Sequence, residues 1–389
     1  MKILMAEHTH FDALMPVGCH QIAKVLARQG HQVTYVSSCV TPLHLANLFG
    51  SKAKETEKRF RNWIIGGHEY PGGLCAYVPL SLLPYRRNFL LDNGFVAQHH
   101  PLWTLPGLVG WIKKRGPFDA MLVGDPKFIP LIDRLQVPVN ILRLTDNVLG
   151  FEDVPRSVAG LLAQAGKKCD RVIVTAKPLV RLMEEQYGIK DAAYVPNGVD
   201  LDRFAQAPPG MPEDLKAIPE PRAVYIGAID RWFDAPLLAS VAGKNPKVSF
   251  VLIGPPRIDL SGLKELKNVH VLGGRPYESL PQYLGACQVG IIPFQNSDLV
   301  RSVSPLKLYE YMACALPVVS IEWDELKSAG SPAYLARNAE DFSAGLLKAL
   351  GEKNTGEKYR EFARKNSWTN RVGKILGLIQ EVQKAKTLP

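Results

Sequence analysis

The chain has 389 residues, which is too long for one ordinary hydrophobic core and therefore predicts two domains. Hydrophobic residues make up 46% and charged residues 22%, a balance that excludes disordered, collagen-like and disulfide-scaffold classes. Lys and Arg number 47 against 37 Asp and Glu. The resulting charge of +10 favours an anionic partner, which is a nucleic acid, a phosphorylated ligand or a membrane surface.

The cysteine pattern and the start of the chain indicate a cytoplasmic protein. The 6 cysteines are scattered without a CxxC pair, and the apolar opening turns polar at Glu7, before a signal-peptide core has formed. The most apolar windows, 78–91 and 101–112, are both interrupted by proline, so we expect no membrane-spanning segment.

Short β-branched runs recur along the chain with helix-length segments between them. Near-continuous apolar strands separated by helices are typical of parallel sheets that are covered on both faces. We therefore predict the α/β class, with two Rossmann-like, doubly wound domains. The expected strands are 2–6, 32–37, 120–123, 140–144 and 171–175 in the first domain, and 223–226, 249–253, 269–272, 289–293 and 318–321 in the second.

Proline marks the expected domain boundary. The stretch 206–221 is rich in proline, which disfavours both a helix and a central strand there. We predict a linker at 206–221 between an N-terminal domain, 1–205, and a C-terminal domain, 222–357. The tail, 358–389, is helical in composition, and we expect it to cross back toward the first domain.

Two doubly wound domains predict a ligand at the carboxyl ends of the strands, in the cleft between the domains. The first strand-to-helix turn has no GxGxxG motif, which argues against a dinucleotide cofactor, and a helix over 18–30 follows it. This turn carries His8, His10 and Asp12. These three side chains either line the acceptor side of the cleft or belong to a solvated turn.

The second domain contains the sequence SPLKLYEYMA at 304–313. Ser304 is suited to the N-cap of a helix and Pro305 to its first position. Lys307 and Glu310 are then three residues apart, on one helical face. A helix N-terminus with a lysine suits an anion, and a carboxylate one turn further can accept hydrogen bonds from a ribose diol. An ordinary ion pair between the two side chains is the alternative.

These residues carry a resemblance to a known family. The segment 304–320 resembles the nucleotide-sugar signature of glycosyltransferases with the GT-B fold, and so do VPNGVD at 195–200, YIGAI at 225–229 and GGRPY at 273–277. The resemblance is greatest to family-4-like bacterial enzymes of teichuronic acid and exopolysaccharide assembly, with a distant likeness to the xanthan glucuronosyltransferase. It implies a GT-B fold and the transfer of a hexosyl or glucuronosyl unit.

The resemblance also implies a role for individual residues. Lys307 would neutralise the donor diphosphate, Glu310 would bind the ribose, and Gly227 would let the backbone approach the phosphates. Arg231 would add a second cation unless neighbouring aspartates pair with it. The implied donor-binding residues are Gly227, Ile229, Arg231, Gly254, Pro276, Tyr277, Phe294, Ser304, Pro305, Leu306, Lys307 and Glu310.

The resemblance leaves the donor sugar and the stereochemistry of transfer open. Family-4 enzymes usually carry a first glutamate eight positions before the second, and Ser302 occupies that position relative to Glu310.

Asp146 is the predicted catalytic base. It follows the strand 140–144 and matches the proposed base of the xanthan enzyme. A carboxylate at a strand end that opens into the cleft can take the proton of an acceptor hydroxyl, whereas an Asx-turn or a helix cap is the alternative. The sequence DLD at 200–202 follows a Pro-Asn-Gly turn, so we assign it a structural role. We predict no essential metal and no cofactor, because the nucleotide sugar is a substrate.

Basic clusters beside aromatic and leucine residues are concentrated in the first domain. Such clusters suit an interfacial contact with anionic lipid or with a lipid-linked diphosphate, and a solvated face is the alternative. The clusters are Lys52, Lys54, Lys58, Arg59 and Arg61, then Arg86 and Arg87, then Lys113, Lys114 and Arg115.

We therefore expect a metal-independent glycosyltransferase at the inner face of the plasma membrane, bound peripherally through the N-terminal domain. It would move a sugar from a UDP-sugar, or another nucleoside-diphosphate sugar, to a lipid-diphosphate-linked or growing polysaccharide acceptor in cell-surface polysaccharide synthesis. A nucleic-acid-binding protein would also explain the charge, but the chain has no aromatic-basic repeat, and we expect no nucleic acid partner. A two-domain solute-binding protein would need an export signal, which we do not find.

Overall fold

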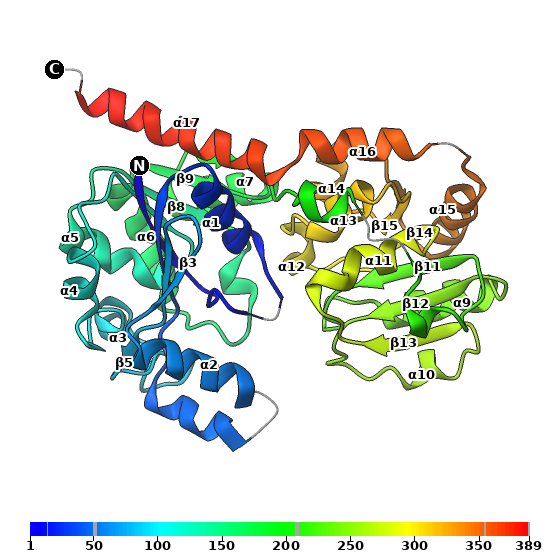
Figure 1. The fold of residues 1–389 in the computed structure, drawn as a ribbon, viewed down its shortest axis with the longest axis horizontal. Helices are drawn as coiled ribbons and strands as arrows, with labels where there is room; N and C mark the ends of the chain where they lie inside the picture. The colour runs from blue at the N-terminus through cyan, green and yellow to red at the C-terminus, as the bar shows by residue number, and fades with distance from the viewer. Residues whose placement is uncertain (14, 50–52, 207–209, 354, 388–389) are drawn as a thin grey trace. The chain divides into compact units, whose positions relative to one another are not determined.

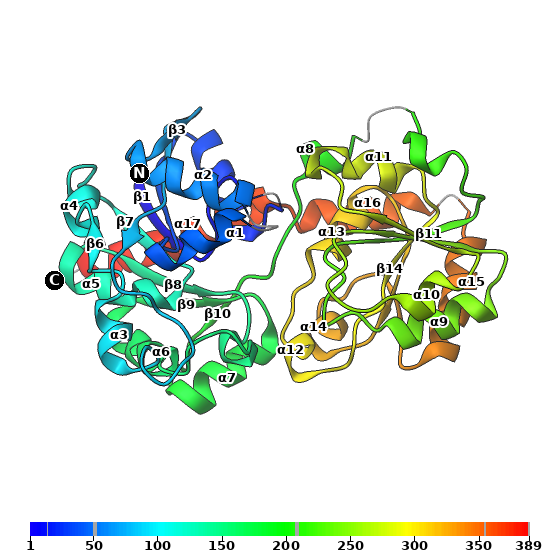
Figure 2. The same cartoon turned by 90° about the horizontal axis from the view of Figure 1, so that it is seen from below.

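The structure is a computed structural model that describes residues 1–13, 15–49, 53–206, 210–353 and 355–387. The chain forms two compact α/β units (Figures 1 and 2). The first contains Met1–Pro196 and Arg371–Pro389, and the second contains Asn197–Asn370.

The first unit is built on an 8-stranded sheet of order β10-β9-β8-β7-β1-β2-β4-β3. Its strands run parallel except for β3, which lies antiparallel to β4 at one edge. The strands are β1 (Lys2–Glu7), β2 (Gln32–Ser37), β3 (His68–Tyr70), β4 (Leu74–Tyr77), β7 (Ala120–Val123), β8 (Asn140–Leu144), β9 (Arg171–Val174) and β10 (Ala193–Tyr194); β5 (Leu80–Ser81) and β6 (Thr104–Leu105) pair separately.

Helices cover both faces of this sheet. Leu4 and Ala6 of β1 pack in one buried cluster with Leu161 of α6, whereas Ile3 and Met5 alternate to the other face. The helices are α1 (Gly18–Arg28), α2 (Ala53–Ile64), α3 (Gly94–His99), α4 (Leu108–Lys113), α5 (Ile132–Leu135), α6 (Val158–Lys168) and α7 (Lys177–Tyr187), with 3-10 turns η1 (Pro42–Phe49), η2 (Pro126–Leu131) and η3 (Val148–Gly150).

The second unit has a 6-stranded parallel sheet of order β13-β12-β11-β14-β15-β16. Helices α9, α10 and α15 lie on one side of it, and α8, α11, α13 and α16 lie on the other (Figure 2). The strands are β11 (Arg222–Ile226), β12 (Ser249–Ile253), β13 (Val269–Gly273), β14 (Val289–Ile292), β15 (Val318–Ile321) and β16 (Tyr334–Ala336). The helices are α8 (Leu201–Phe204), α9 (Ala235–Lys244), α10 (Ser261–Lys264), α11 (Leu280–Gly285), α12 (Asp298–Arg301), α13 (Leu306–Ala313), α14 (Asp324–Ser328), α15 (Ala339–Gly351) and α16 (Gly356–Lys365), with turns η4 (Glu213–Leu215) and η5 (Tyr277–Ser279).

The predicted α/β class is confirmed, and every strand predicted from a β-branched run is present to within one residue at either end. Strands β3, β4, β5, β6, β10 and β16 were not predicted. These strands are short, and the longest of them, β4, has 4 residues.

The boundary between the units differs from the predicted linker at 206–221. The chain passes from the first unit to the second after Pro196. Within the predicted linker, Leu215 and Ile218 are 0% and 6% exposed and belong to the core of the second unit. Residues 207–209 of that stretch lie outside the described residues. Proline disfavours an α-helix or a strand here, but the 3-10 turn η4 forms, and Leu215 and Ile218 are still buried.

The tail, predicted as a single helix over 358–389, consists of α16 and α17 (Trp368–Thr387). The interruption has a clear cause in hydrogen bonding. Val199 N donates to Asn366 O at 3.1 Å, and Trp368 N donates to Val199 O at 3.0 Å. The backbone between the two helices therefore pairs with the segment around Val199 instead of continuing a helix.

The two tail helices belong to different units. Helix α16 packs against α13 in the second unit, and the chain from Arg371 onward is part of the first unit. There Val372 and Ile379 of α17 are fully buried, and Lys386 Nζ lies 2.6 Å from Asp170 Oδ1. The tail thus returns to the first unit through α17.

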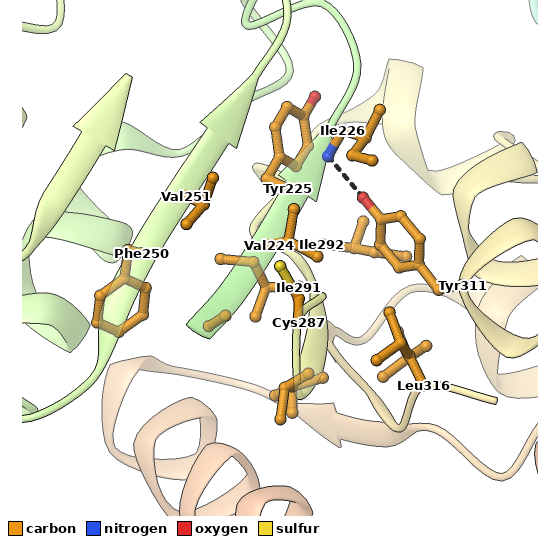
Figure 3. Packing of buried hydrophobic residues seen from close by; sticks show 14 of the residues in the cluster. Val224, Tyr225, Ile226, Phe250, Val251, Cys287, Ile291, Ile292, Tyr311 and Leu316 are labelled. Atoms are coloured by element: carbon orange, nitrogen blue, oxygen red, sulfur yellow. Dashed lines mark hydrogen bonds between the residues drawn. The ribbon is translucent and has the colours of Figure 1, made fainter. Parts of the chain in front are cut away.

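Tyr311 joins α13 to the end of β11 (Figure 3). Its hydroxyl oxygen accepts a hydrogen bond from Ile226 N at 2.7 Å. Its ring lies directly on Gly290 of β14, where a Cβ atom would come within 2.3 Å of Tyr311 Cδ2. Helix α13 is therefore held against the carboxyl end of β11, beside Gly227.

We expect Tyr311→Phe to lower the free energy of unfolding of the second unit by about 1–3 kcal/mol, because the buried Ile226 N–H would lose its acceptor. Urea unfolding, followed by circular dichroism, measures this. Tyr187→Phe, at a partly buried position on α7 of the first unit, is the control and should leave the unfolding transition of the second unit unchanged. Equal unfolding midpoints for the two variants would contradict the role of Tyr311.

Candidate functional site

Two glycines form the floor of the site in the second unit. Gly227 and Gly254 follow β11 and β12, and their φ angles are 142° and 152°, a region that side-chain-bearing residues avoid. A Cβ atom at Gly254 would fall 1.8 Å from Gly227 O, and one at Gly227 would lie 3.3 Å from Lys307 Nζ. Glycine at 254 therefore lets the two loops pack against each other, and glycine at 227 lets the Lys307 ammonium approach the backbone.

Lys307 extends from the first turn of α13 toward these loops. Its ammonium lies 4.6 Å from the ring centre of Phe294 and 5.2 Å from that of Tyr225. Burial lowers the pKa of Lys307 to about 8, although the charge of Glu310 raises it. The side chain is a partly desolvated cation between aromatic rings, and such a cation attracts an anion more strongly than an exposed lysine does.

Glu310 lies one turn further along α13. Tyr277, which begins η5, donates a hydrogen bond from its hydroxyl to Glu310 Oε1 at 3.1 Å. Burial raises the pKa of Glu310 to about 7, although this hydrogen bond and the charge of Lys307 lower it. None of the ion pairs among the described residues joins Lys307 to Glu310. The oriented carboxylate is thus suited to accept hydrogen bonds from a diol.

Ser304 is not the helix N-cap that the sequence predicts. Helix α13 begins at Leu306, one residue later than expected, and Pro305 precedes it as a cap without a side-chain hydrogen bond. Ser304 Oγ instead accepts from Asn197 N at 3.2 Å, and Ser304 O accepts from Asn197 Nδ2 at 2.8 Å. The Pro-Asn-Gly motif therefore holds the start of α13 in place, a role that sequence reasoning did not assign to Asn197.

The neighbouring predicted residues line the same loops with different exposures. Ile229 N donates to Pro255 O at 3.1 Å, which ties the loop after β11 to the loop after β12. The Arg231 side chain is exposed. Its neighbour Asp230 lies 3.3 Å from an Arg257 nitrogen and accepts a hydrogen bond from Arg231 N at 2.7 Å.

Position 302, where the family usually has its first glutamate, is Ser302, which is buried at the end of α12. A small neutral side chain therefore fills this position.

In the first unit, Asp146 follows β8 at the carboxyl edge of the sheet, where its side chain is partly buried. Burial raises the pKa of Asp146, although a hydrogen bond from Thr145 and the charges of His8 and Arg143 lower it. A carboxylate with a raised pKa is a better proton acceptor while it remains ionised near neutral pH.

The three predicted acceptor-side residues differ in their surroundings. His8 is exposed, and its charge interacts with Asp125 and Asp146 at the ends of the neighbouring strands β7 and β8. His10 is buried, with Nε2 3.6 Å from Glu55 Oε1. Asp12 accepts a hydrogen bond from the hydroxyl of Tyr70 on the edge strand at 2.6 Å. Only His8 therefore lies with Asp146.

Beneath this edge lie two buried ionisable side chains to which sequence reasoning gave no role in the site. Glu7 ends β1, Arg143 lies in β8, and each is 2% exposed. Burial raises the pKa of Glu7 well above its usual value, although the positive charge of Arg143 lowers it. A Cβ atom on Gly124 would lie 1.8 Å from Glu7 Oε2, so glycine is needed there. Arg143 lies within the apolar run 140–144 and Glu7 directly follows the apolar run 2–6, and nothing in either local pattern indicates that the two interact.

Among the described residues, no group of three or more His, Cys, Asp or Glu side chains is arranged to hold a metal ion. In the DLD sequence, Asp200 lies 3.9 Å from Arg203 Nε. Metal independence stays a prediction. Within the described part of the chain, no helix is both long enough and apolar enough to cross a bilayer.

Two α/β units in one chain, each built on a mainly parallel sheet with loops at its carboxyl edge, are the GT-B architecture of glycosyltransferases. Solved structures share it over nearly their whole length. Sucrose-phosphate synthase from Thermosynechococcus elongatus has a TM-score of 0.69 at 16% identity, with 99% of each chain covered. Anabaena Alr3699/HepE, solved in complex with UDP and glucose, has a TM-score of 0.64 at 13% identity, with 98% of this chain and 100% of that chain covered. These likenesses confirm the predicted fold.

The sequence comparisons concern parts of the chain. Residues 220–352 match the family described as "Glycosyl transferases group 1". TuaH of Bacillus subtilis (strain 168), described as a teichuronic acid biosynthesis glycosyltransferase, is 29% identical over 185 residues, which is 44% of this chain and 45% of that protein. The chain thus matches less than half the length of this relative. The resemblance predicted from the motifs is confirmed, whereas the likeness to the xanthan enzyme stays a prediction.

Proposed function

We propose that this protein is a glycosyltransferase that moves a sugar from a UDP-sugar to a saccharide or lipid-linked acceptor in cell-surface polysaccharide synthesis. The observation that carries the proposal is the position of Lys307. Its Nζ atom lies 3.3 Å from the point that a Cβ atom on Gly227 would occupy, and Lys307 precedes Glu310 by one helical turn. The family match over 220–352, the likeness to TuaH and the UDP-bound neighbour support it.

Lys307 would act on the leaving group. When the bond between the sugar and the diphosphate breaks, negative charge grows on the departing phosphate. A preorganised ammonium at the N-terminus of α13 stabilises that charge more in the transition state than in the ground state. Because the required positive charge comes from the chain itself, we propose that transfer needs no divalent metal.

Glu310 and the loops would orient the nucleoside. The carboxylate of Glu310, held by the Tyr277 hydroxyl, would accept hydrogen bonds from the ribose diol. The turns after Gly254 and at Pro276 would enclose the base. Arg231 would supply a second cation from its exposed position.

Asp146 would act on the acceptor hydroxyl. Its partial burial raises its pKa, which favours proton uptake by a general base. If the stereochemistry of transfer is retaining, Asp146 would orient the acceptor hydroxyl instead.

The first unit would also contact an anionic membrane. Phe89 and Leu90 are 91% and 66% exposed and follow the exposed cations Arg86 and Arg87. Exposed apolar side chains beside cations are suited to the headgroup region of a bilayer. Trp111, by contrast, is buried in the core of the unit, so it does not take part in this contact. Lys52 of the first basic cluster lies outside the described residues.

Lys307 makes UDP binding sensitive to pH. The pKa of Lys307 is lowered by burial to about 8, so its ammonium predominates below that pH and is lost above it. We expect the affinity for UDP to be nearly constant below this pH and to fall above it, by up to about tenfold per pH unit. Isothermal titration calorimetry from about pH 7 to about pH 9 measures the effect.

Two variants complete that test. Lys307→Arg should remove the fall, because a guanidinium stays charged throughout this range. Lys307→Ala should weaken UDP binding at neutral pH by at least about tenfold. An unchanged affinity in Lys307→Ala would refute the donor site. A fall that persists in Lys307→Arg would assign the titration to another group of the site, such as Glu310, whose pKa is raised to about 7.

We expect Asp146→Asn to lower the rate of sugar transfer by about 10²- to 10⁴-fold, because the amide does not take up a proton. Transfer of label from a UDP-sugar to the lipid and polysaccharide fractions of bacterial membranes measures the rate. Asp153→Asn, at an exposed position in the same unit, is the control and should remain active. Full activity in Asp146→Asn would exclude it as the base, and a parallel loss of UDP affinity would indicate a structural role.

The double variant Phe89→Ser, Leu90→Ser should reduce sedimentation with vesicles containing phosphatidylglycerol by at least about tenfold, because it removes the apolar part of the contact. Leu347→Ser is the matched control, since Leu347 is 59% exposed on α15 of the second unit. Equal vesicle binding by the two variants would show that Phe89 and Leu90 belong to a solvated loop and do not contact the membrane.

A further inference from the structure

The first unit contains a polar pocket of about 350 Å³, and all of its lining residues lie between His8 and Lys127. This volume is in the range of small-molecule sites. Its walls come from the turn after β1, the segment after β2, η1, α2, the loop after β5, and η2. The polar side chains used in the argument below are His10, His44, Glu55, Arg59, Arg86 and Lys127.

Arg59 is the best-placed cation in this pocket. Its NH2 nitrogen donates to Ser38 O at 3.0 Å and to Cys39 O at 3.2 Å, which fixes the plane of the guanidinium. Its Nε atom is buried and makes no hydrogen bond among the described residues. Of the five N–H donors of the guanidinium, only those of NH2 have a hydrogen-bond partner among the described residues, and a guanidinium does not lose its charge to avoid the cost of burial.

Histidines add neutral groups to the same walls. His44 Nδ1 accepts a hydrogen bond from Thr41 N at 3.0 Å, so in the neutral ring its proton is on Nε2. His10 is 6% exposed, and its Nε2 atom makes no hydrogen bond among the described residues. Burial lowers the pKa of His10 to about 4, which keeps the ring neutral at physiological pH.

The charge of the pocket is positive. Arg59, Arg86 and Lys127 face a single lining carboxylate, Glu55. Lys127 Nζ also lies 3.4 Å from Asp125 Oδ2, which neutralises part of its charge. A pocket with fixed guanidinium donors and excess positive charge is suited to a phosphate group, which supplies several acceptor oxygens and negative charge.

The pocket also borders the exposed apolar loop. Arg86 lines the pocket, and Phe89, which is 91% exposed, follows it three residues later. A molecule whose phosphate lies beside Arg86 would therefore have the apolar side chains of this loop within reach of its other end.

We infer that this pocket binds the phosphate or diphosphate group of the acceptor, held chiefly by Arg59 with Lys127 and Arg86. The acceptor role rests on the proposed function, whereas phosphate binding by the first unit does not. The source of the phosphate is either a lipid-linked diphosphate or a soluble phosphorylated saccharide, and the two share the chemistry that the pocket recognises.

The test uses the full-length Lys307→Ala variant, so that the donor site does not capture the probe. Isothermal titration calorimetry measures the binding of inorganic pyrophosphate and of farnesyl diphosphate. Adding Arg59→Gln should weaken both by at least about tenfold, because a charged hydrogen bond is lost. Arg61→Gln, at an exposed position on the same helix, is the matched control and should change neither. Tighter binding of farnesyl diphosphate than of pyrophosphate supports a lipid-linked acceptor, and equal binding supports a soluble one.

A second variant separates binding from folding, because Arg59 also holds the carbonyls of Ser38 and Cys39. If Arg59→Gln lowers the melting temperature, Lys127→Gln provides the decisive comparison and should weaken the binding of both probes several-fold. The proposal is overturned if the Lys307→Ala variant binds neither probe, or if Arg59→Gln, Lys127→Gln and Arg61→Gln all bind alike. Failure of the wild type to bind UDP would refute the donor site without affecting this result.

Discussion

The hydrogen bond between Ile226 N and the Tyr311 hydroxyl connects the last residue of β11 to the middle of α13. Lys307 is four residues before Tyr311, on the same face of the helix, and Gly227 is the next residue after Ile226. One bond between two rigid elements therefore sets the distance between the ammonium and the glycine loop. Gly290 makes the arrangement possible, because any side chain there would displace the Tyr311 ring.

This geometry explains why Lys307 and Glu310 act as separate groups. Residues three apart on a helix usually pair when their charges are opposite. Here Tyr277 takes the carboxylate as its acceptor, and aromatic rings surround the ammonium. Burial lowers the pKa of Lys307 to about 8 and raises that of Glu310 to about 7, so neither charge is fully satisfied within the protein. Two ionisable groups whose charges are incompletely balanced by the surrounding protein are suited to a ligand that carries both an anion and hydroxyl groups.

The sequence predicts the features that depend on local patterns. The strands are recognised because buried parallel strands are continuous apolar runs, and Gly227, Lys307 and Glu310 follow from motifs within short segments. The start of α13 was misplaced because Ser304 hydrogen-bonds to Asn197, a contact between residues far apart in the sequence. The interaction between Glu7 and Arg143 was missed for the same reason, since the two residues are far apart in the sequence and the sheet brings them together. Leu215 lies inside the predicted linker but packs in the core of the second unit, and proline content does not predict such packing.

The two polar regions differ in how they carry positive charge, and the difference matches what each would have to do. A group that assists a leaving diphosphate benefits from a lysine, whose pKa shifts with its surroundings, because binding an anion restores the protonated form that burial disfavours. A group that only holds a phosphate benefits from a charge that never titrates and from donors in a fixed plane, as Arg59 has through its bonds to Ser38 and Cys39. Lysine on α13 is therefore consistent with a part in the reaction, and arginine on α2 is consistent with anchoring a phosphate.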